Sequence, residues 1–163
     1  MIRVREILIS IIQVYNHRLY FYLRKVVLSK ENFKAYRMIY LGIIKFIESY
    51  HNSYIGITMD EGTEFKSLPI FPHGLNGIVI HHKARIGNRC MIMQQVTIGG
   101  TTNENGPIAA IIGDNCFLGA GCKILGEVKI GNNVKIGANA VVLDDIPDNC
   151  TAVGIPARIV KRG

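Results

Sequence analysis

A six-residue repeat runs through the second half of this sequence and limits what the chain can fold into. Six consecutive hexads begin at Ile112: IGDNCF, LGAGCK, ILGEVK, IGNNVK, IGANAV and VLDDIP. Each starts with an aliphatic residue and has a small or β-branched residue at its fifth position, while Gly or Asn fills many of the second to fourth positions. The same frame returns upstream at Ile80, Ile86, Ile92 and Ile98. Such self-similarity is typical of proteins built from one repeated structural unit.

A period of six matches neither the turn of an α-helix nor the simple alternation of a strand. It describes a short strand and a sharp turn, with the aliphatic first position in a narrow core and the small fifth position near a corner. Gly and Asn tolerate the left-handed backbone that such turns require. Three hexads close one coil of about 18 residues, and coils stack at the strand spacing of roughly 4.8 Å. The sequence therefore predicts a mainly β fold, a parallel β-helix of roughly four or five coils.

The repeat is interrupted once, between Ile98 and Ile112. These positions are 14 residues apart, two more than two hexads, and the stretch GGTTNENGP between them is rich in turn-forming residues. We therefore expect a loop over residues 99–111 that leaves the coil. The β-helix domain is predicted to cover residues 55–163, with this loop and a C-terminal tail, after an N-terminal helical segment over residues 1–54.

The N-terminal segment carries most of the positive charge. Residues 1–38 hold eight Lys or Arg against two Glu, a net charge of +6, whereas the other 125 residues have a net charge of +1. Apolar residues recur there at spacings of three and four, which is helix periodicity: Leu8, Ile11, Ile12, Tyr15, Leu19, Tyr22 and Val26. A second helix is predicted over about 31–50, with an apolar face of Met38, Leu41, Ile44 and Phe46.

Two roles remain open for the predicted helices. They pack on the β-helix or at an oligomer interface, or residues 1–38 form a basic amphipathic surface that rests on anionic lipid. The longest uncharged run in this segment has ten residues, whereas a membrane span needs about 20. No small-residue cleavage site follows, so we expect no signal peptide and a cytoplasmic protein, with the inner face of the membrane as a possible contact.

The four cysteines are predicted to be reduced and structural. No CxxC pair occurs, so the sequence supports neither a zinc ribbon nor a dithiol redox site. Cys90, Cys116 and Cys122 occupy fifth positions of their hexads, where a buried cysteine acts as a small apolar residue, which argues against an acyl-cysteine intermediate. Cys150 lies outside the frame. Nucleic-acid binding is not expected, because the sequence contains no recognised binding module.

Several stretches of the repeat region resemble a known family. They are PHGLNGIVI (72–80), QQVTIGG (94–100), IGDNCFLGAGCKILGEVKIGNNVKIGANAVVLDDIP (112–147) and AVGIPARIV (152–160). Through them, residues 56–163 resemble the serine acetyltransferase branch of the hexapeptide-repeat acyltransferase superfamily, including its relatives in surface-polysaccharide biosynthesis. The resemblance implies a left-handed coil, a homotrimer or a dimer of trimers, acetyl-CoA as the acetyl donor, and active sites between adjacent β-helices.

The resemblance also implies a catalytic base. In the family it is a histidine just before the GIVI-like strand, and its counterpart here is His73. A hydroxyl is a weak nucleophile at neutral pH, and an imidazole with a pKa near 7 can take its proton during attack on a thioester. Backbone amides of Gly99 and Gly100 are candidate donors to the resulting oxyanion. Either Thr58 or Asp60 is expected to orient the imidazole.

Three positions depart from the serine acetyltransferase pattern. The family usually has Asp-His where this chain has Pro72-His73, and that aspartate helps to hold the amino acid. The family's aspartate that orients the histidine falls on Thr58, and a further family histidine falls on Ala109. We therefore expect the acceptor to be a sugar hydroxyl in capsule, exopolysaccharide or lipopolysaccharide biosynthesis. The alternative is a serine O-acetyltransferase of cysteine biosynthesis.

The resemblance supplies candidate residues for both substrates. The expected cofactor-binding residues are Gly99, Gly100, Ala120, Gly121, Lys135, Gly137, Ala138, Arg158 and Lys161. The small residues are expected to border pantetheine, and the basic ones to bind the phosphates, where charge-assisted hydrogen bonds are strong. His81 and His82 fill turn positions of the hexad IHHKAR. They are either a solvent-facing pair or acceptor contacts across the subunit boundary, near His73.

Two functions of other classes are weaker alternatives. A metal-dependent hydratase would need three histidines to hold zinc between subunits, and a non-catalytic trimeric scaffold would bind no CoA. The acetyltransferase-like motifs favour neither, so we expect no metal ion.

Overall fold

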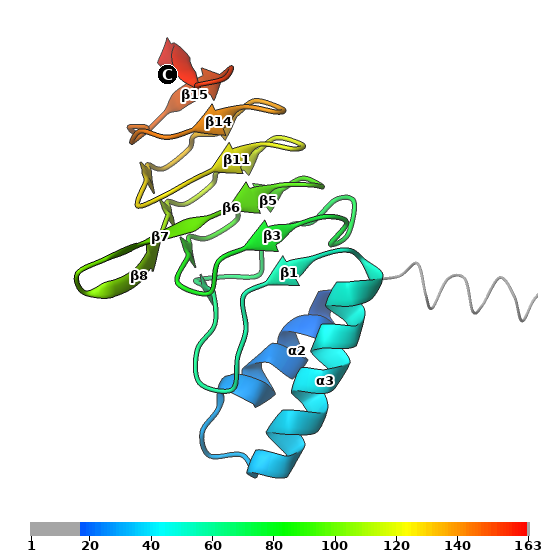
Figure 1. The fold of residues 1–163 in the computed structure, drawn as a ribbon. Helices are drawn as coiled ribbons and strands as arrows, with labels where there is room; N and C mark the ends of the chain where they lie inside the picture. The colour runs from blue at the N-terminus through cyan, green and yellow to red at the C-terminus, as the bar shows by residue number, and fades with distance from the viewer. Residues whose placement is uncertain (1–16, 163) are drawn as a thin grey trace, which may run out of the picture.

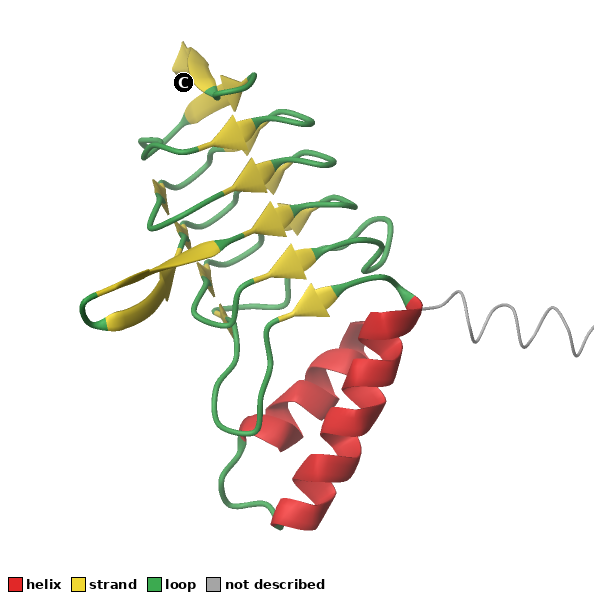
Figure 2. Cartoon of the chain, viewed as in Figure 1, coloured by secondary structure: helices red, strands yellow, loops and turns green. Residues whose placement is uncertain are grey.

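The computed structural model describes residues 17–162 as two helices followed by a stack of coils (Figure 1). The helices α2 (His17–Leu28) and α3 (Lys34–Tyr50) pack against each other at the N-terminal end of the stack. From β1 (Tyr54–Ile55) onward the chain consists mostly of two-residue strands separated by turns (Figure 2). The predicted boundary between residues 54 and 55 falls inside β1.

The strands form three faces around a narrow core. Face I contains β1, β3 (Val79–Ile80), β6 (Thr97–Ile98), β11 (Lys123–Ile124) and β14 (Val141–Val142). Face II contains β2 (Glu64–Phe65), β4 (Arg85–Ile86), β9 (Ile111–Ile112) and β12 (Lys129–Ile130). Face III contains β5 (Met91–Ile92), β10 (Phe117–Leu118), β13 (Lys135–Ile136), β15 (Cys150–Val153) and β16 (Arg158–Arg162). Neighbouring strands of a face run parallel, except β15 and β16.

The hexads occupy these faces as the sequence predicts. Successive first positions pass from face to face: Ile80 lies in face I, Ile86 in face II and Ile92 in face III. First positions of neighbouring coils pair directly, as Ile98 and Ile124 do, and both are fully buried. Fourth positions take the left-handed conformation, with φ between 53° and 60° at Arg89, Gln95, Asn115, Asn133 and Asn139. The predicted mainly β fold of parallel hexapeptide coils is confirmed.

The last coil is two residues shorter than the predicted frame. Ile146 pairs with Ile130 of face II, so it follows Val142 by four residues rather than six. The Asp145 carboxylate (Oδ1) accepts the backbone N–H of Lys129 at 2.7 Å. This side chain takes the place of the carbonyl that a full-length coil would supply.

Cys150 returns to the repeat because of this shortening. It lies two residues before Ala152, which pairs with Ile136, and it is buried like the other three cysteines. The prediction that Cys150 lies outside the frame is therefore wrong. Burial raises the pKa of the Cys122 thiol to about 12, as expected of a structural cysteine.

The loop predicted over residues 99–111 is a β-hairpin for most of its length. Strands β7 (Gly100–Asn103) and β8 (Gly106–Ala109) pair antiparallel, with Gly100 opposite Ala109. The hairpin projects from the stack of coils, beside β6 (Figure 1). The coil then resumes at β9.

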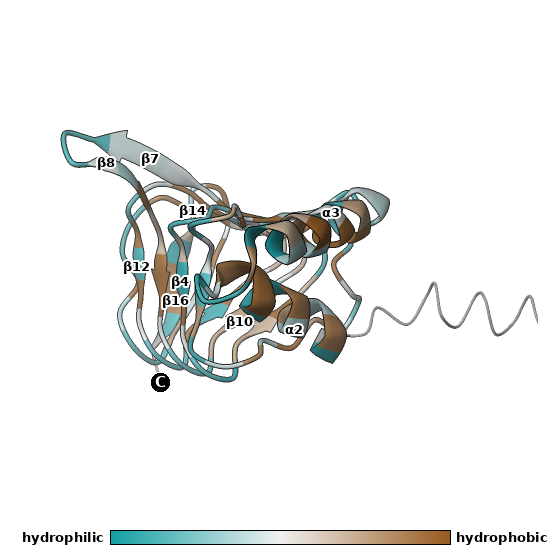
Figure 3. Cartoon of the chain, turned by 90° about the horizontal axis from the view of Figure 1, so that it is seen from below, coloured by the Kyte–Doolittle hydropathy of each residue, from teal (hydrophilic) through white to brown (hydrophobic). Residues whose placement is uncertain are grey.

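The inward face of α2 differs from the predicted one. Tyr20, Leu23 and Val27 are buried, whereas the predicted positions Leu19 and Tyr22 are 49% and 61% exposed. Figure 3 shows apolar segments on both helices, where they lie across the N-terminal end of the coils. The predicted positions Leu8, Ile11, Ile12 and Tyr15 lie outside the described residues.

The inward face of α3 also differs. Ile44 is buried and Leu41 is partly buried, but Met38 and Phe46 are exposed. The exposed apolar residues instead follow a stripe at spacings of three and four: Tyr36, Ile39, Ile43, Phe46 and Tyr50. Periodicity alone misplaced both inward faces because charged residues of these helices are buried too: Arg24, Arg37 and Glu48. Neither of the described helices has the length and hydropathy needed to cross a membrane.

Arg24 joins α2 to the first coil. Its guanidinium donates hydrogen bonds to the backbone carbonyls of Ile55, Gly56 (3.2 Å) and Thr63 (3.4 Å), and the residue is only 3% exposed. These carbonyls belong to a segment in which the hexad frame is lost. The arginine therefore supplies the hydrogen bonds that a regular coil would obtain from its neighbour.

Arg24→Met should lower the free energy of unfolding by about 2 kcal/mol, because it leaves buried carbonyls without donors. Urea unfolding followed by circular dichroism measures this change. Arg18→Met on the exposed side of the same helix is the matched control and should be close to neutral. Equal stability of the two variants would contradict the assigned role of Arg24.

Candidate functional site

Three edges separate the faces, and each is a column of stacked turns. The His73 edge, between faces III and I, comprises residues 71–77, 93–96, 119–122 and 137–140. The hairpin edge, between faces I and II, comprises residues 56–63, 81–84, 99–110 and 125–128. The asparagine edge, between faces II and III, comprises residues 87–90, 113–116 and 131–134. Most of the predicted site residues divide between the first two edges.

His73 lies in the turn that leads into β3. Backbone hydrogen bonds stack the turns of this edge: Gln95 N–H donates to the carbonyl of Asn76 at 2.9 Å, and Asn139 N–H donates to that of Ala120 at 2.8 Å. His73 therefore lies on the same edge as the small residues predicted to border pantetheine: Ala120, Gly121, Gly137 and Ala138. The His73 residue is exposed, so its imidazole is open to a substrate lying along this edge.

Gln94 is a residue of the His73 edge that the sequence did not single out. Its backbone carbonyl accepts the N–H of Gly121 at 3.0 Å, so its turn lies between the turn that contains His73 and the turn that contains Ala120. Its side-chain Oε1 is the one buried side-chain N or O atom without a hydrogen-bond partner among residues 17–162. The stretch QQVTIGG contains this residue, but only the coil packing shows that the oxygen is buried.

The hairpin edge carries the other two histidines of the repeat region. The rings of His81 and His82 stack with centroids 4.3 Å apart. His82 Nε2 lies 3.4 Å from Glu61 Oε2, which also binds Lys83 Nζ at 2.8 Å. The Lys83 backbone N–H donates to His81 Nδ1 at 3.2 Å. Both rings are half-buried rather than solvent-facing.

The surroundings of His81 keep its ring neutral. Burial lowers the pKa of His81 below 6.5, and the positive charges of His82 and Lys83 lower it further. The hydrogen bond from Lys83 likewise lowers the pKa of Glu61, so this carboxylate stays charged beside the histidine pair. His81 is therefore an uncharged imidazole at neutral pH.

This pKa shift predicts a pH dependence of stability. Because the folded His81 binds a proton less readily than the unfolded one, unfolding becomes easier as the pH falls through about 6.5. His81→Gln should show a smaller loss of urea midpoint between pH 7.5 and pH 5 than the wild-type protein. Identical pH profiles for the two proteins would contradict this prediction.

Thr58 and Asp60 do not lie beside His73 of the same chain. Both belong to the loop between β1 and β2, on the hairpin edge. The Thr58 hydroxyl accepts the backbone N–H groups of Asp60 (3.3 Å) and Glu61 (3.1 Å), and the Asp60 carboxylate lies 3.8 Å from the Arg37 guanidinium. Within one chain, the structure therefore does not support the prediction that either residue orients the imidazole.

The two glycines at the base of the hairpin differ in what they can do. The Gly99 N–H already donates to the carbonyl of Ile124 at 2.8 Å, so it is not free to bind an oxyanion. A Cβ on Gly100 would lie 2.5 Å from the Ile108 carbonyl oxygen and 2.9 Å from the His81 ring. Glycine is required at position 100 because the Ile108 carbonyl and the His81 imidazole both pack directly against the backbone there.

The predicted phosphate contacts lie away from both edges. Lys135 is exposed on the outer side of face III, and Arg158 and Lys161 belong to β16 at the C-terminal end of that face. Arg158 Nη1 lies 3.7 Å from Asp144 Oδ2, and both side chains are largely exposed. The three cations thus flank the C-terminal coils, where the His73 edge also ends.

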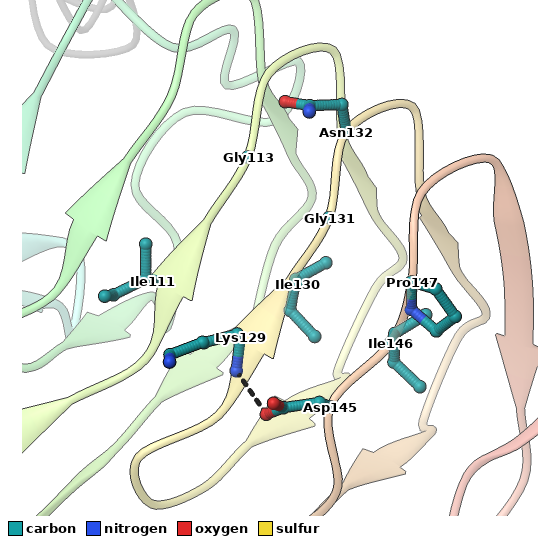
Figure 4. Close-up of a pocket in the computed structure, with 9 residues that line it drawn as sticks. All are labelled: Ile111, Gly113, Lys129, Ile130, Gly131, Asn132, Asp145, Ile146 and Pro147. Carbon is teal, nitrogen blue, oxygen red and sulfur yellow. Dashed lines mark hydrogen bonds between the residues drawn. The ribbon is translucent and has the colours of Figure 1, made fainter.

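A shallow groove lies on the outside of face II (Figure 4). Its lining residues are Ile111, Gly113, Lys129, Ile130, Gly131, Asn132, Asp145, Ile146 and Pro147. It forms where the shortened last coil leaves face II one strand short of its neighbours. None of the predicted site residues lines this groove, and it gathers no histidine or nucleophile.

Comparisons with known proteins agree with this arrangement. The family described as bacterial transferase hexapeptide (six repeats) matches residues 109–144. The serine acetyltransferase of Staphylococcus aureus is 44% identical over 109 residues, which are 67% of this chain and 51% of that protein. This chain therefore spans about half the length of the relatives it matches.

Solved structures of serine acetyltransferases also match this chain. Soybean serine acetyltransferase complexed with serine matches with a TM-score of 0.71 and 34% identity over 90% of this chain and 58% of that one. A serine acetyltransferase in complex with CoA matches with a TM-score of 0.65 and 31% identity, over 88% of this chain and 54% of that one. The matches confirm the predicted left-handed β-helix, and the relatives and solved structures named above are serine acetyltransferases. This chain thus matches the bacterial transferase hexapeptide family over residues 109–144 and is similar to serine acetyltransferases over about two thirds of its length.

Proposed function

We propose that this protein is an acetyl-CoA-dependent O-acetyltransferase with L-serine as its acceptor and His73 as its general base. The observation that carries the proposal is the His73 edge, which places an exposed imidazole on the same edge as small residues of the later coils, in a chain similar to serine acetyltransferases. The small residues Ala120, Gly121, Gly137 and Ala138 suit a narrow chain such as pantetheine lying along these coils. Lys135, Arg158 and Lys161, on face III beside the C-terminal end of this edge, are the candidates for binding the phosphates of CoA.

The reaction follows from the chemistry of these groups. His73 takes the proton of the acceptor hydroxyl as its oxygen attacks the thioester carbonyl carbon. The carbonyl oxygen becomes negatively charged and needs hydrogen-bond donors, for which Gly100 N–H is a candidate. When the carbon–sulfur bond breaks, the thiolate of CoA takes the proton from the His73 imidazolium. The products are an acetyl ester and free CoA.

The comparisons favour serine over the sugar acceptor that we expected from the sequence. One of the matched structures is a complex with serine, and the matched relatives are serine acetyltransferases. A sugar hydroxyl remains the second candidate, because Pro72 replaces the aspartate that helps to hold the amino acid and Thr58 lies away from His73. The surface-polysaccharide role receives no support from the comparisons.

The assembly and cellular location belong to the same proposal. A homotrimer or a dimer of trimers would bring edges of neighbouring copies together. The basic helical segment, including residues 17–38 of α2 and α3, is a candidate contact for anionic lipid, which would place a cytoplasmic enzyme at the inner face of the membrane. Vesicle sedimentation with and without anionic lipid tests this contact.

An acceptor screen tests the proposed function. With acetyl-CoA held constant, release of the CoA thiol is measured with L-serine, nucleotide sugars and free saccharides. We expect the highest kcat/KM with L-serine. Faster transfer to a saccharide would replace serine with the second candidate, and no transfer to any acceptor would overturn the acetyltransferase proposal.

A further inference from the structure

The sequence gives no reason to distinguish the adjacent histidines His81 and His82, but the structure gives them different hydrogen-bond partners. His82 is held by the Glu61 carboxylate, so its Nε2 is already occupied. His81 uses only Nδ1, which accepts the Lys83 backbone N–H. In a neutral imidazole with Nδ1 as acceptor, the proton is on Nε2, which is then a hydrogen-bond donor. His81 therefore presents one fixed N–H group, and His82 supports it by stacking.

His81 lies at the base of the hairpin formed by β7 and β8. Its ring packs against Gly100, where even a Cβ would collide with it. Gly100 pairs with Ala109 across the hairpin. The serine acetyltransferase pattern has a histidine at the position of Ala109, so His81 places an imidazole beside the point where this chain lacks one.

His73 and His81 lie on opposite edges of face I within one chain. His73 comes before β3, and His81 follows it directly. The outward side chains of this face are mostly uncharged: Tyr54, Val79, Thr97 and Val141, with Tyr54 and Val79 each 40% exposed. The exception is Lys123, whose Nζ donates to the carbonyl of Gly121 at the His73 edge. Such a surface can be covered by further copies of the chain.

If several copies of the chain packed with face I around a common axis, the His73 edge of one copy would lie beside the hairpin edge of another. In a closed ring each copy uses two different surfaces, so the His73 edge of one copy meets the hairpin edge of the next. The two imidazoles cannot meet across face I of one chain, but they can meet between two chains.

We propose that His81 is a second catalytic imidazole of the transfer site and that it acts on the acetyl group held at the His73 edge of a neighbouring copy. The inference rests on the proposed function. His81 donates its Nε2–H to the oxyanion that forms when the acceptor oxygen attacks the thioester, and it keeps its proton throughout. The proton of the acceptor still passes through His73 to the leaving thiolate.

Steady-state kinetics test the role of His81. His81→Ala should lower kcat by about 10²-fold, the effect of removing one oxyanion donor, with KM for acetyl-CoA changed much less. His81→Gln retains an N–H donor and should recover part of the loss. His82→Ala should have a smaller effect, because it removes only the stacking partner. A His81→Ala enzyme with wild-type kcat would overturn the assignment.

Subunit mixing tests whether His81 acts between copies. His73→Ala and His81→Ala chains carrying different tags are co-expressed, and assemblies that contain both are isolated. In a mixed ring of three, one boundary always joins an intact His73 to an intact His81, so activity should return to about a third of the wild-type value. Mixed assemblies no more active than the parents would overturn the contribution between copies.

A cross-link reports the same contact without relying on activity. His73→Cys chains mixed with His81→Cys chains should form cross-linked dimers with a short bismaleimide, whereas either variant alone should not. The four native cysteines are buried and give a low background. If the cross-link does not form, the two edges do not meet and the inference fails. If the cross-link forms but the wild-type enzyme acetylates no acceptor, the proposed function is wrong, and the catalytic role of His81 is then wrong as well.

Discussion

His73→Ala should lower kcat for acetyl transfer by about 10²- to 10⁴-fold, the range that a general base contributes. The His73 imidazole is the exposed titratable group on the edge that also holds the small residues predicted to border pantetheine. Without it, the acceptor hydroxyl must lose its proton to water, which is a far weaker base. Initial rates of CoA release at saturating acetyl-CoA and acceptor measure the loss.

Two controls separate this chemical effect from misfolding or lost binding. Because His73 is exposed, His73→Ala should leave the urea midpoint close to that of the wild-type protein. Its affinity for CoA, measured by calorimetry, should also change little, since the imidazole acts on the acceptor. A variant that binds CoA normally and retains full kcat would show that another group is the base.

Gly113→Ala should lower the free energy of unfolding by about 3 kcal/mol or more. An added Cβ would lie 2.6 Å from the carbonyl oxygen of Gly131 in the next coil, and 2.8 Å from Oδ1 of Asn132. The first of these neighbours is backbone, and strand pairing holds coils at a spacing of about 4.8 Å. Relief of the clash must therefore disturb hydrogen bonds between β9 and β12. Urea unfolding measures the change.

Gly42→Ala is the matched control for this substitution. Gly42 lies in α3, and an added Cβ would meet nothing within 4 Å. Alanine restricts the unfolded chain more than glycine does, so this variant should gain about 0.5–1 kcal/mol of stability. Opposite signs for the two variants are the expected result. A Gly113→Ala protein as stable as the wild type would mean that the coils are less tightly packed at the asparagine edge.

The sequence predicted the regular coils well because one local pattern determines them. Each hexad specifies a buried aliphatic residue, a small corner residue and a turn, and the same contacts recur in every coil. The sequence-based prediction was less accurate where the hexad pattern is interrupted. The shortened coil ending at Ile146 changed the position of Cys150, and the loop between β1 and β2 moved Thr58 away from His73.

For the helices α2 and α3, the spacing of apolar residues did not predict which side faces the coils. Apolar residues lie around more than one side of α2 and α3, so their spacing did not identify the inward side. Buried charged residues mark that side instead. The Arg24 guanidinium meets backbone carbonyls of the first coil, and Glu48 accepts the hydroxyl proton of Tyr20 at 2.6 Å. Both contacts join residues far apart in the chain, which periodicity does not reveal.

By itself, the sequence determined the β-helix and the turn positions, since each depends on residues close together in the chain, whereas His73 became the candidate base through the resemblance to a known family. The tertiary structure alone decided which candidates share an edge. It placed His73 on the same edge as the residues predicted to border pantetheine, left Gln94 with a buried acceptor, and packed His81 against Gly100. The physical reason is that an edge joins residues about one coil apart, and the spacing along the chain changes wherever a loop lengthens or shortens that coil.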